Sequence, residues 1–217
     1  MRLGILVSGR GSNLAAILEA GLPDIESVIV ISNRPNVPAL DVASRHDVPV
    51  RVLRRAEFAD AVARDRAIGA ALAEAGVELA LLAGYDQLLR ASYFAAFSGR
   101  TINIHPSLLP LHGGPGMLGL AVQRSVLAAG AVVSGVTIHE VTADLDAGPI
   151  LAQARVPVLT DDDPETLAAR VLAVEHRLLV DTLGDMSMRA PSGTGRASMP
   201  NGAPRGAHPP QERPGSH

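Results

Sequence analysis

Short, almost wholly apolar runs alternate with longer segments of helical apolar spacing over the first half of the chain. The apolar runs predict strands at residues 3–7, 27–31, 48–52, 79–83 and 101–105. The segments between them predict helices at residues 14–20, 39–46, 59–75 and 91–97. Strands that are apolar on both faces are typical of parallel sheets covered by helices. The pattern therefore predicts a doubly wound α/β fold, a mostly parallel sheet with helices on both faces.

The second half of the chain departs from this alternation. Residues 118–129 have helical spacing, and two strand-like runs at 132–141 and 149–158 flank a short polar turn. Strands on either side of a short turn can pair antiparallel, so we predict an antiparallel C-terminal addition to the sheet. Asp163, followed by a proline, is a favoured helix start, and it predicts a last helix that ends near Leu183.

Composition separates the end of the chain from the rest. Residues 186–217 are rich in Ser, Gly, Pro and Arg and nearly empty of large apolar side chains. Ordering such a segment costs more entropy than its burial would offset. We therefore expect one catalytic domain over residues 1–185 and a low-complexity, disordered tail over 186–217. A tail that binds an acidic partner through its arginines is the alternative.

Charge and cysteine content narrow the function classes. The chain has 217 residues, is 47% hydrophobic and carries a formal net charge of -3, which favours one substantial core and gives no general attraction to nucleic acid. It has no cysteine, which excludes disulfides and thiolate chemistry and is compatible with the cytoplasm. No uninterrupted apolar stretch reaches the roughly 20 residues of a membrane helix. We expect a soluble protein that needs no metal.

Asn103 and His105 stand at the end of a predicted strand. Side chains two residues apart share one face of a strand, and ligands of parallel α/β sheets gather at the carboxyl ends of the strands. An amide N–H and an imidazolium that converge there could stabilise an oxyanion, and the imidazole could transfer a proton. The alternative is a polar pair that is hydrogen-bonded to nearby backbone.

A glycine-containing turn at residues 8–13 joins the first strand to the first helix. Its glycines allow a ligand to approach closely, and the free N–H groups of a helix N-terminus favour an anion such as phosphate. The turn lacks the third glycine of the dinucleotide fingerprint and the lysine of a P-loop. The other interpretation is an ordinary turn in which Ser12 or Asn13 caps the helix.

Other polar residues allow two interpretations. Asp144 and Asp146 lie in the polar turn, where Asp is common for conformational reasons, yet either could orient or charge a histidine. His112 lies in a glycine-rich segment that is either a substrate lid or a plain surface loop. For His139, in a strand, and His176, in a helix, we prefer a structural role.

Five segments in a fixed order carry a resemblance to a known family: residues 8–13, 83–85, 103–110, 144–149 and 175–176. Over about residues 1–183 the chain resembles the phosphoribosylglycinamide formyltransferases of purine biosynthesis, and the resemblance implies their formyltransferase fold. It also implies formyl transfer from 10-formyltetrahydrofolate to the amine of 5′-phosphoribosylglycinamide, on the route to IMP. Such an enzyme is expected to be cytoplasmic, to act as a monomer or homodimer on small molecules, and to use no metal, nucleic acid or membrane.

The resemblance assigns roles residue by residue. It implies that the catalytic residues are His105, Asn103 and Asp146, with the first two facing the formyl group and Asp146 keeping His105 charged. The phosphate and ribose of the acceptor would be bound by Gly11, Ser12, Asn13 and Glu175. The folate would be held, largely by backbone groups, by Asp86, Gln87, Leu88, Leu89, Asn103, Ala143 and Asp144.

Some positions depart from the family pattern. Relatives often carry Met-Arg where this chain has Asp86 and Gln87, and another arginine where it has Ala61. Those arginines would neutralise the glutamate tail of folate, and Arg64 is a candidate substitute. Gln123 matches a histidine of relatives. We expect the chemistry to be retained with an altered grip on the folate. The resemblance also predicts a cis peptide bond between Leu109 and Pro110.

Two other functions stay open on the sequence. A formyltransferase that acts on the amine of a sugar nucleotide would present the same Asn and His. An inactive folate- or nucleotide-binding regulator would keep the fold without the chemistry. A methionyl-tRNA formyltransferase is not favoured, because it would add a folded basic domain for tRNA, whereas the net charge here is negative.

Overall fold

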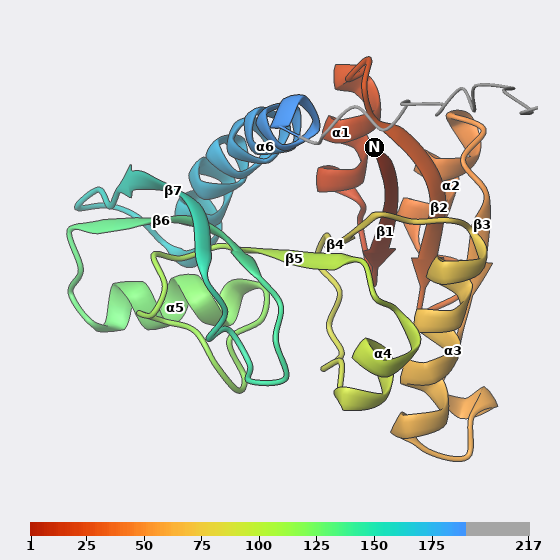
Figure 1. Cartoon of the computed structure of the whole chain (residues 1–217). Coiled ribbons are helices and arrows are strands. Elements are labelled where there is room, and N and C mark those ends of the chain that lie inside the picture. The colour runs from red at the N-terminus through yellow and green to blue at the C-terminus, as the bar shows by residue number, and fades with distance from the viewer. Residues whose placement is uncertain (190–217) are drawn as a thin grey trace, which may run out of the picture.

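The structure is a computed structural model and describes residues 1–189. A seven-stranded sheet in the order β3-β2-β1-β4-β5-β6-β7 forms its centre (Figure 1). The parallel strands are β1 (Arg2–Val7), β2 (Glu26–Ser32), β3 (Val50–Val52), β4 (Leu79–Leu82) and β5 (Arg100–His105). Strands β6 (Val133–Glu140) and β7 (Ile150–Pro157) continue the sheet antiparallel. The predicted parallel sheet with an antiparallel C-terminal addition is confirmed.

Helices cover both faces of this sheet. On one face lie α1 (Ser12–Ala20), α2 (Pro38–Arg45), α5 (Leu120–Ala128) and α6 (Pro164–Arg189). On the other lie α3 (Ala61–Glu74) and α4 (Ala91–Ala96), and a short 3-10 turn, η1 (Arg55–Glu57), precedes α3. Strand β1 shows the division, because Leu3 and Ile5 pack in the first core and Leu6 packs in the second. This is the alternation expected of a strand buried on both sides.

The last helix is longer than the sequence pattern predicts. It ends at Arg189 instead of near Leu183, and Met186 packs partly buried against the first core. Leu179, Leu183 and Met186 continue one apolar stripe at helical spacing, which carries the helix past Gly184. The predicted helix end near Leu183 is therefore about six residues too early, and the predicted domain boundary after residue 185 falls inside α6. The rest of the predicted tail, residues 190–217, lies outside the described residues.

Local hydrogen bonds set other helix starts. Helix α3 begins at Ala61, two residues later than predicted, because the Asp60 side chain accepts a hydrogen bond from Ala63 N at 2.7 Å and so acts as the N-cap.

Within residues 1–189, no helix combines the length and the apolar composition needed to cross a membrane.

Candidate active site

A cavity of about 720 Å³ opens at the carboxyl ends of β1, β4 and β5. Helix α1 begins at one side of it, α6 contributes Glu175, and the turn after β6 contributes Asp146. Of the site residues predicted from the sequence, only Ala143 does not line this cavity. Those that do are Gly11, Ser12, Asn13, Asp86, Gln87, Leu88, Leu89, Asn103, His105, Asp144, Asp146 and Glu175. The structure thus brings segments that are distant in sequence into one site.

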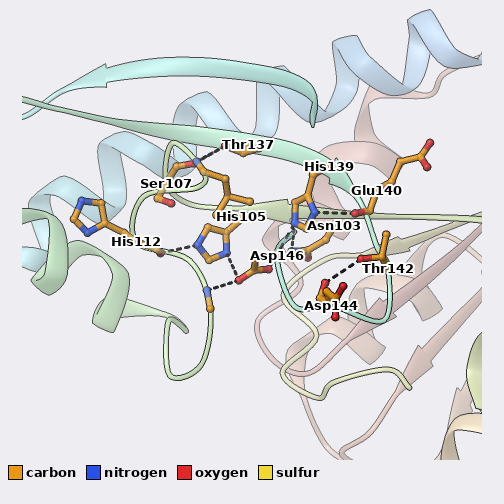
Figure 2. Close-up of polar contacts among 12 residues, drawn as sticks. Asn103, His105, Ser107, His112, Thr137, His139, Glu140, Thr142, Asp144 and Asp146 are labelled. Carbon is orange, nitrogen blue, oxygen red and sulfur yellow. Dashed lines mark hydrogen bonds and ion pairs between the residues drawn. The ribbon is translucent and has the colours of Figure 1, made fainter. Parts of the chain in front are cut away.

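His105 is held at the end of β5 by contacts on both ring nitrogens (Figure 2). Its Nε2 lies 2.9 Å from the carbonyl oxygen of His112, which can only accept, so Nε2 carries a hydrogen. Its Nδ1 lies 4.0 Å from Asp146 Oδ2, an ion pair when the imidazole is protonated. The His105 side chain is 6% exposed. Nδ1 is therefore the nitrogen of His105 that is available for chemistry.

The two turn carboxylates differ in what they face. Asp146 points at His105, and its Oδ2 also accepts a hydrogen bond from Gly114 N at 2.8 Å. Its backbone has φ 53°, a left-handed conformation that Asp tolerates better than most residues. Asp144 is exposed, and its backbone oxygen accepts from Thr142 Oγ1 at 3.0 Å. Of the two, Asp146 is the partner of the histidine.

His139 belongs to the site, although the sequence favoured a purely structural role for it. The antiparallel register pairs His139 of β6 with Asn103 of β5, and Asn103 Nδ2 lies 3.1 Å from His139 Nε2. His139 Nδ1 donates to the Glu140 carbonyl oxygen at 2.9 Å, so Nε2 keeps a lone pair and accepts from the Asn103 amide. Burial lowers the pKa of His139, which favours this neutral form. The signal that would have identified His139 is the strand register, which the sequence does not encode locally.

The start of α1 has the backbone expected of an anion site. Gly11 has φ 76°, and a Cβ added there would lie 2.7 Å from Ala39 Cα, so only glycine fits. No side chain caps the helix, and the expected alternative in which Ser12 or Asn13 caps it is wrong. Asn13 Nδ2 instead donates to Glu175 Oε1 at 2.7 Å.

The Asn13–Glu175 pair is buried at the wall of the cavity. Asn13 is 6% exposed, and its Oδ1 has no hydrogen-bond partner among the described residues. Burial raises the pKa of Glu175, while the Asn13 hydrogen bond and the Arg10 charge oppose that rise. An unpaired buried oxygen that lines a cavity is an acceptor for a ligand hydroxyl or N–H.

The segment after β4 is fixed by contacts that the sequence did not indicate. Asp86 Oδ1 accepts from Ser8 Oγ at 2.9 Å and from Asn33 Nδ2 at 2.7 Å, and its other oxygen pairs with Arg34. The Asp86 carboxylate thereby ties together the loops that follow β1, β2 and β4. Gln87 Oε1 is buried without a partner among the described residues.

Arg64 cannot replace a tail-binding arginine. It is 4% exposed, pairs with Asp65, and donates to the Leu88 carbonyl oxygen at 2.9 Å from beneath the cavity wall. It supports the segment that follows β4 from below and does not line the cavity. The expectation that Arg64 substitutes for the missing arginines is therefore wrong.

The glycine-rich loop after β5 contacts the side chains of His105 and Asp146 through its backbone. His112 O and Gly114 N bind His105 and Asp146, and His112 Nδ1 lies 2.8 Å from Ser125 Oγ of α5. The Leu109–Pro110 peptide bond is cis, as predicted. Gln123 is 2% exposed, lines the cavity, and donates to Pro106 O at 3.3 Å. His112 is thus part of a loop whose backbone contacts His105 and Asp146.

Among residues 1–189, no group of three or more His, Cys, Asp or Glu side chains is arranged to hold a metal ion. His176 does not line the cavity.

The sequence of this chain is similar to that of known formyl transferases. The sequence pattern of the formyl transferase family matches residues 1–183. Phosphoribosylglycinamide formyltransferase of Mycobacterium tuberculosis is 39% identical over 198 residues, which are 91% of this chain and 90% of the relative. The chloroplastic phosphoribosylglycinamide formyltransferase of Arabidopsis thaliana is 39% identical over 188 residues, which are 84% of this chain and 64% of the relative. The chain thus spans less than two thirds of the plant relative's length.

A solved structure agrees with the sequence relatives. Glycinamide ribonucleotide transformylase 1 from Symbiobacterium toebii superimposes with a TM-score of 0.80 at 41% identity, covering 87% of this chain and 88% of that one.

Proposed function

This chain belongs to the formyl transferase family of enzymes, and we propose that it transfers a formyl group from 10-formyltetrahydrofolate to the amine of 5′-phosphoribosylglycinamide. The observation that carries the proposal is the convergence of Asn103, His105 and Asp146 in a cavity that also contains the start of α1. The proposed catalytic side chains and the proposed anion site at the start of α1 line the same cavity. The relatives named above are phosphoribosylglycinamide formyltransferases or a glycinamide ribonucleotide transformylase by name, which supports the same acceptor.

The chemistry needs stabilisation of a developing negative charge. As the acceptor amine attacks the formyl carbon, charge builds on the formyl oxygen, and the Asn103 amide and protonated His105 are the donors at hand. The Nε2–H of His105 is bonded to His112 O, so the donor that we expect to serve the reacting group is Nδ1–H, whose nitrogen lies 4.0 Å from Asp146 Oδ2. Removing one such donor typically lowers kcat by about 10²- to 10³-fold.

Asp146 acts through His105. Its carboxylate, 4.0 Å from Nδ1, stabilises the imidazolium and helps a proton leave the attacking amine and reach the departing nitrogen, directly or through water. Gly114 N holds the carboxylate in this orientation. The acceptor's phosphate binds at the start of α1, on Gly11, Ser12 and Asn13, and its ribose hydroxyls bind Glu175.

The cavity fits a folate-derived donor. Its volume, about 720 Å³, lies in the range of pockets that enclose drug-sized ligands. The unpartnered Gln87 Oε1 offers an acceptor to a pterin N–H, and Leu88 and Leu89 supply apolar wall. The Asp86 carboxylate is already bonded to Ser8, Asn33 and Arg34, so we expect Asp86 to contribute to donor binding through its backbone. That the enzyme is cytoplasmic, uses no metal and is a monomer or homodimer stays a prediction.

An acceptor panel tests the proposal. Purified protein is given 10-formyltetrahydrofolate with either 5′-phosphoribosylglycinamide or an amino-sugar nucleotide, and the release of tetrahydrofolate and the formylated product are measured together. We expect turnover with the first acceptor and a kcat/KM at least about 100-fold lower with the second. Preferential formylation of the amino sugar would establish the alternative acceptor. Absence of turnover with both, in a protein that binds the folate, would support the inactive regulator.

A further inference from the structure

The charges that line the cavity are strongly unbalanced. Its carboxylates are Asp86, Asp144, Asp146 and Glu175. All 19 basic residues of the chain are arginine, and Arg10 is the one arginine among the described residues that lines this cavity. A phosphorylated ligand brings up to two further negative charges into that surrounding. Arg34 already pairs with Asp86 and His105 faces Asp146, whereas Asp144 and Glu175 have no ion-pair partner among the described residues. A cation beside the phosphate would offset these two carboxylates and strengthen binding of the ligand.

Arg10 is placed to be that cation. It follows Gly9 and precedes Gly11, the N-cap of α1, so its backbone belongs to the turn that begins the helix. Helix α2 holds this turn in place, because Ala39 N donates a hydrogen bond to Gly9 O at 3.2 Å. The Arg10 side chain is exposed and forms no hydrogen bond or ion pair within residues 1–189. The backbone is held while the guanidinium stays free for a ligand.

A second feature of the same wall indicates a ligand. Asn13 is 6% exposed, and its Oδ1 has no partner in the described part of the chain. That oxygen can only accept, so it fits a hydroxyl or amide N–H and does not fit a phosphate oxygen. The wall therefore offers an acceptor beside a cation and the free N–H groups of α1. This combination matches a sugar phosphate better than a simple anion.

We propose that Arg10 binds the phosphate of the acceptor and makes the enzyme select phosphorylated over non-phosphorylated acceptors. The inference rests on the proposed function and adds a residue to it. Backbone N–H groups of α1 supply partial charges and orientation, whereas the guanidinium supplies a full charge and two donors in a fork that matches two phosphate oxygens. Without Arg10, the phosphate would face the carboxylates of the cavity with only partial charges to hold it.

Two acceptors and three proteins test the proposal. The acceptors are 5′-phosphoribosylglycinamide and ribosylglycinamide without phosphate, and the proteins are wild type, Arg10→Gln and Arg66→Ala. Arg66 is a matched control because it is exposed on α3, on the opposite face of the sheet. We expect Arg10→Gln to raise KM for the phosphorylated acceptor about 10- to 100-fold with little change in kcat. Its KM for ribosylglycinamide should equal that of wild type, and Arg66→Ala should match wild type on both.

Equal KM effects on both acceptors, or no effect on either, would overturn the role of Arg10. Failure of the proposed function would look different from failure of the Arg10 proposal, because the wild-type protein would then formylate neither acceptor. In that case calorimetric binding of ribose 5-phosphate and of ribose decides the question. Loss of ribose 5-phosphate binding in Arg10→Gln supports phosphate recognition, and unchanged binding contradicts it. The melting temperature of each variant confirms that it is folded.

Discussion

At the scale of single residues, His139 controls the orientation of the Asn103 amide. Its Nδ1–H is committed to the Glu140 carbonyl oxygen, and its Nε2 accepts one hydrogen of Asn103 Nδ2. This leaves the second amide hydrogen of Asn103 free for the reacting group. The arrangement exists only while His139 is neutral, because a protonated ring would present a donor to a donor.

This dependence on a neutral ring predicts a pH effect. Burial lowers the pKa of His139 below its ordinary value, so the neutral form persists through neutral pH and is lost as the pH falls through that lowered pKa. We expect kcat to fall at acidic pH as His139 becomes protonated. In His139→Gln, whose Oε1 can still accept from Asn103, the acid limb should shift to lower pH. In His139→Ala, kcat should drop about 2- to 10-fold at neutral pH through loss of one hydrogen bond.

The measurement is kcat between pH 4.5 and 8 at saturating substrates for wild type and both variants. Identical acid limbs in wild type and His139→Gln would show that another group titrates there. Equal kcat in His139→Ala and wild type at neutral pH would remove His139 from the positioning of Asn103.

Residue roles were predictable where a local rule applies and not where the fold decides. The two-residue spacing placed Asn103 and His105 on one face, and both line the cavity. The choice between Asp144 and Asp146 depends on the backbone of the turn, including the left-handed φ of Asp146. The role of His139 depends on the register between β5 and β6, and that of Arg64 on burial beneath a wall.

At the scale of elements, the junction of α1 and α2 sets the shape of the anion site. Gly11 has a left-handed backbone and lies close to Ala39. A Cβ added at Gly11 would clash with Ala39. Glycine content indicated a turn here. The absence of a side-chain cap was not predictable, because Asn13 turns away to Glu175 of α6, which lies far along the chain.

Gly11→Ala should therefore destabilise the protein and weaken acceptor binding together. The left-handed backbone alone costs about 1–2 kcal/mol for an L-residue, and the clash with Ala39 adds to it. Gly9→Ala is the stability control, since a Cβ at Gly9 would meet nothing within 4 Å. Chemical denaturation measures both variants against wild type. A Gly11→Ala protein as stable as Gly9→Ala would contradict the packing argument.

At the scale of the whole molecule, the sequence predicted a single doubly wound domain because each strand is apolar enough to be buried on both faces. It did not predict the strand order, since β1 lies between β2 and β4 through contacts of widely separated segments. It also placed the end of the last helix too early, near Leu183, because the polar composition that follows masked an apolar stripe that continues to Met186.

The position of that stripe predicts where the chain can be shortened. A protein that ends at Arg189 keeps all of α6 and should match the full chain in melting temperature and kcat. A protein that ends at Gly184 loses the partly buried Met186 and should melt a few degrees lower. Thermal unfolding followed by circular dichroism, with kcat on the same samples, compares the three. A lower melting temperature on removal of residues 190–217 alone would show that they contribute to stability.

The central claim is that His105, with Asn103 and Asp146, performs the transfer. Its most direct test is the single-turnover rate of formyl transfer to 5′-phosphoribosylglycinamide in wild type and His105→Ala, with exposed His46→Ala as control. We expect a rate about 10²- to 10⁴-fold lower in His105→Ala, with unchanged acceptor affinity and a wild-type rate in His46→Ala. A His105→Ala protein that transfers the formyl group at the wild-type rate would contradict it.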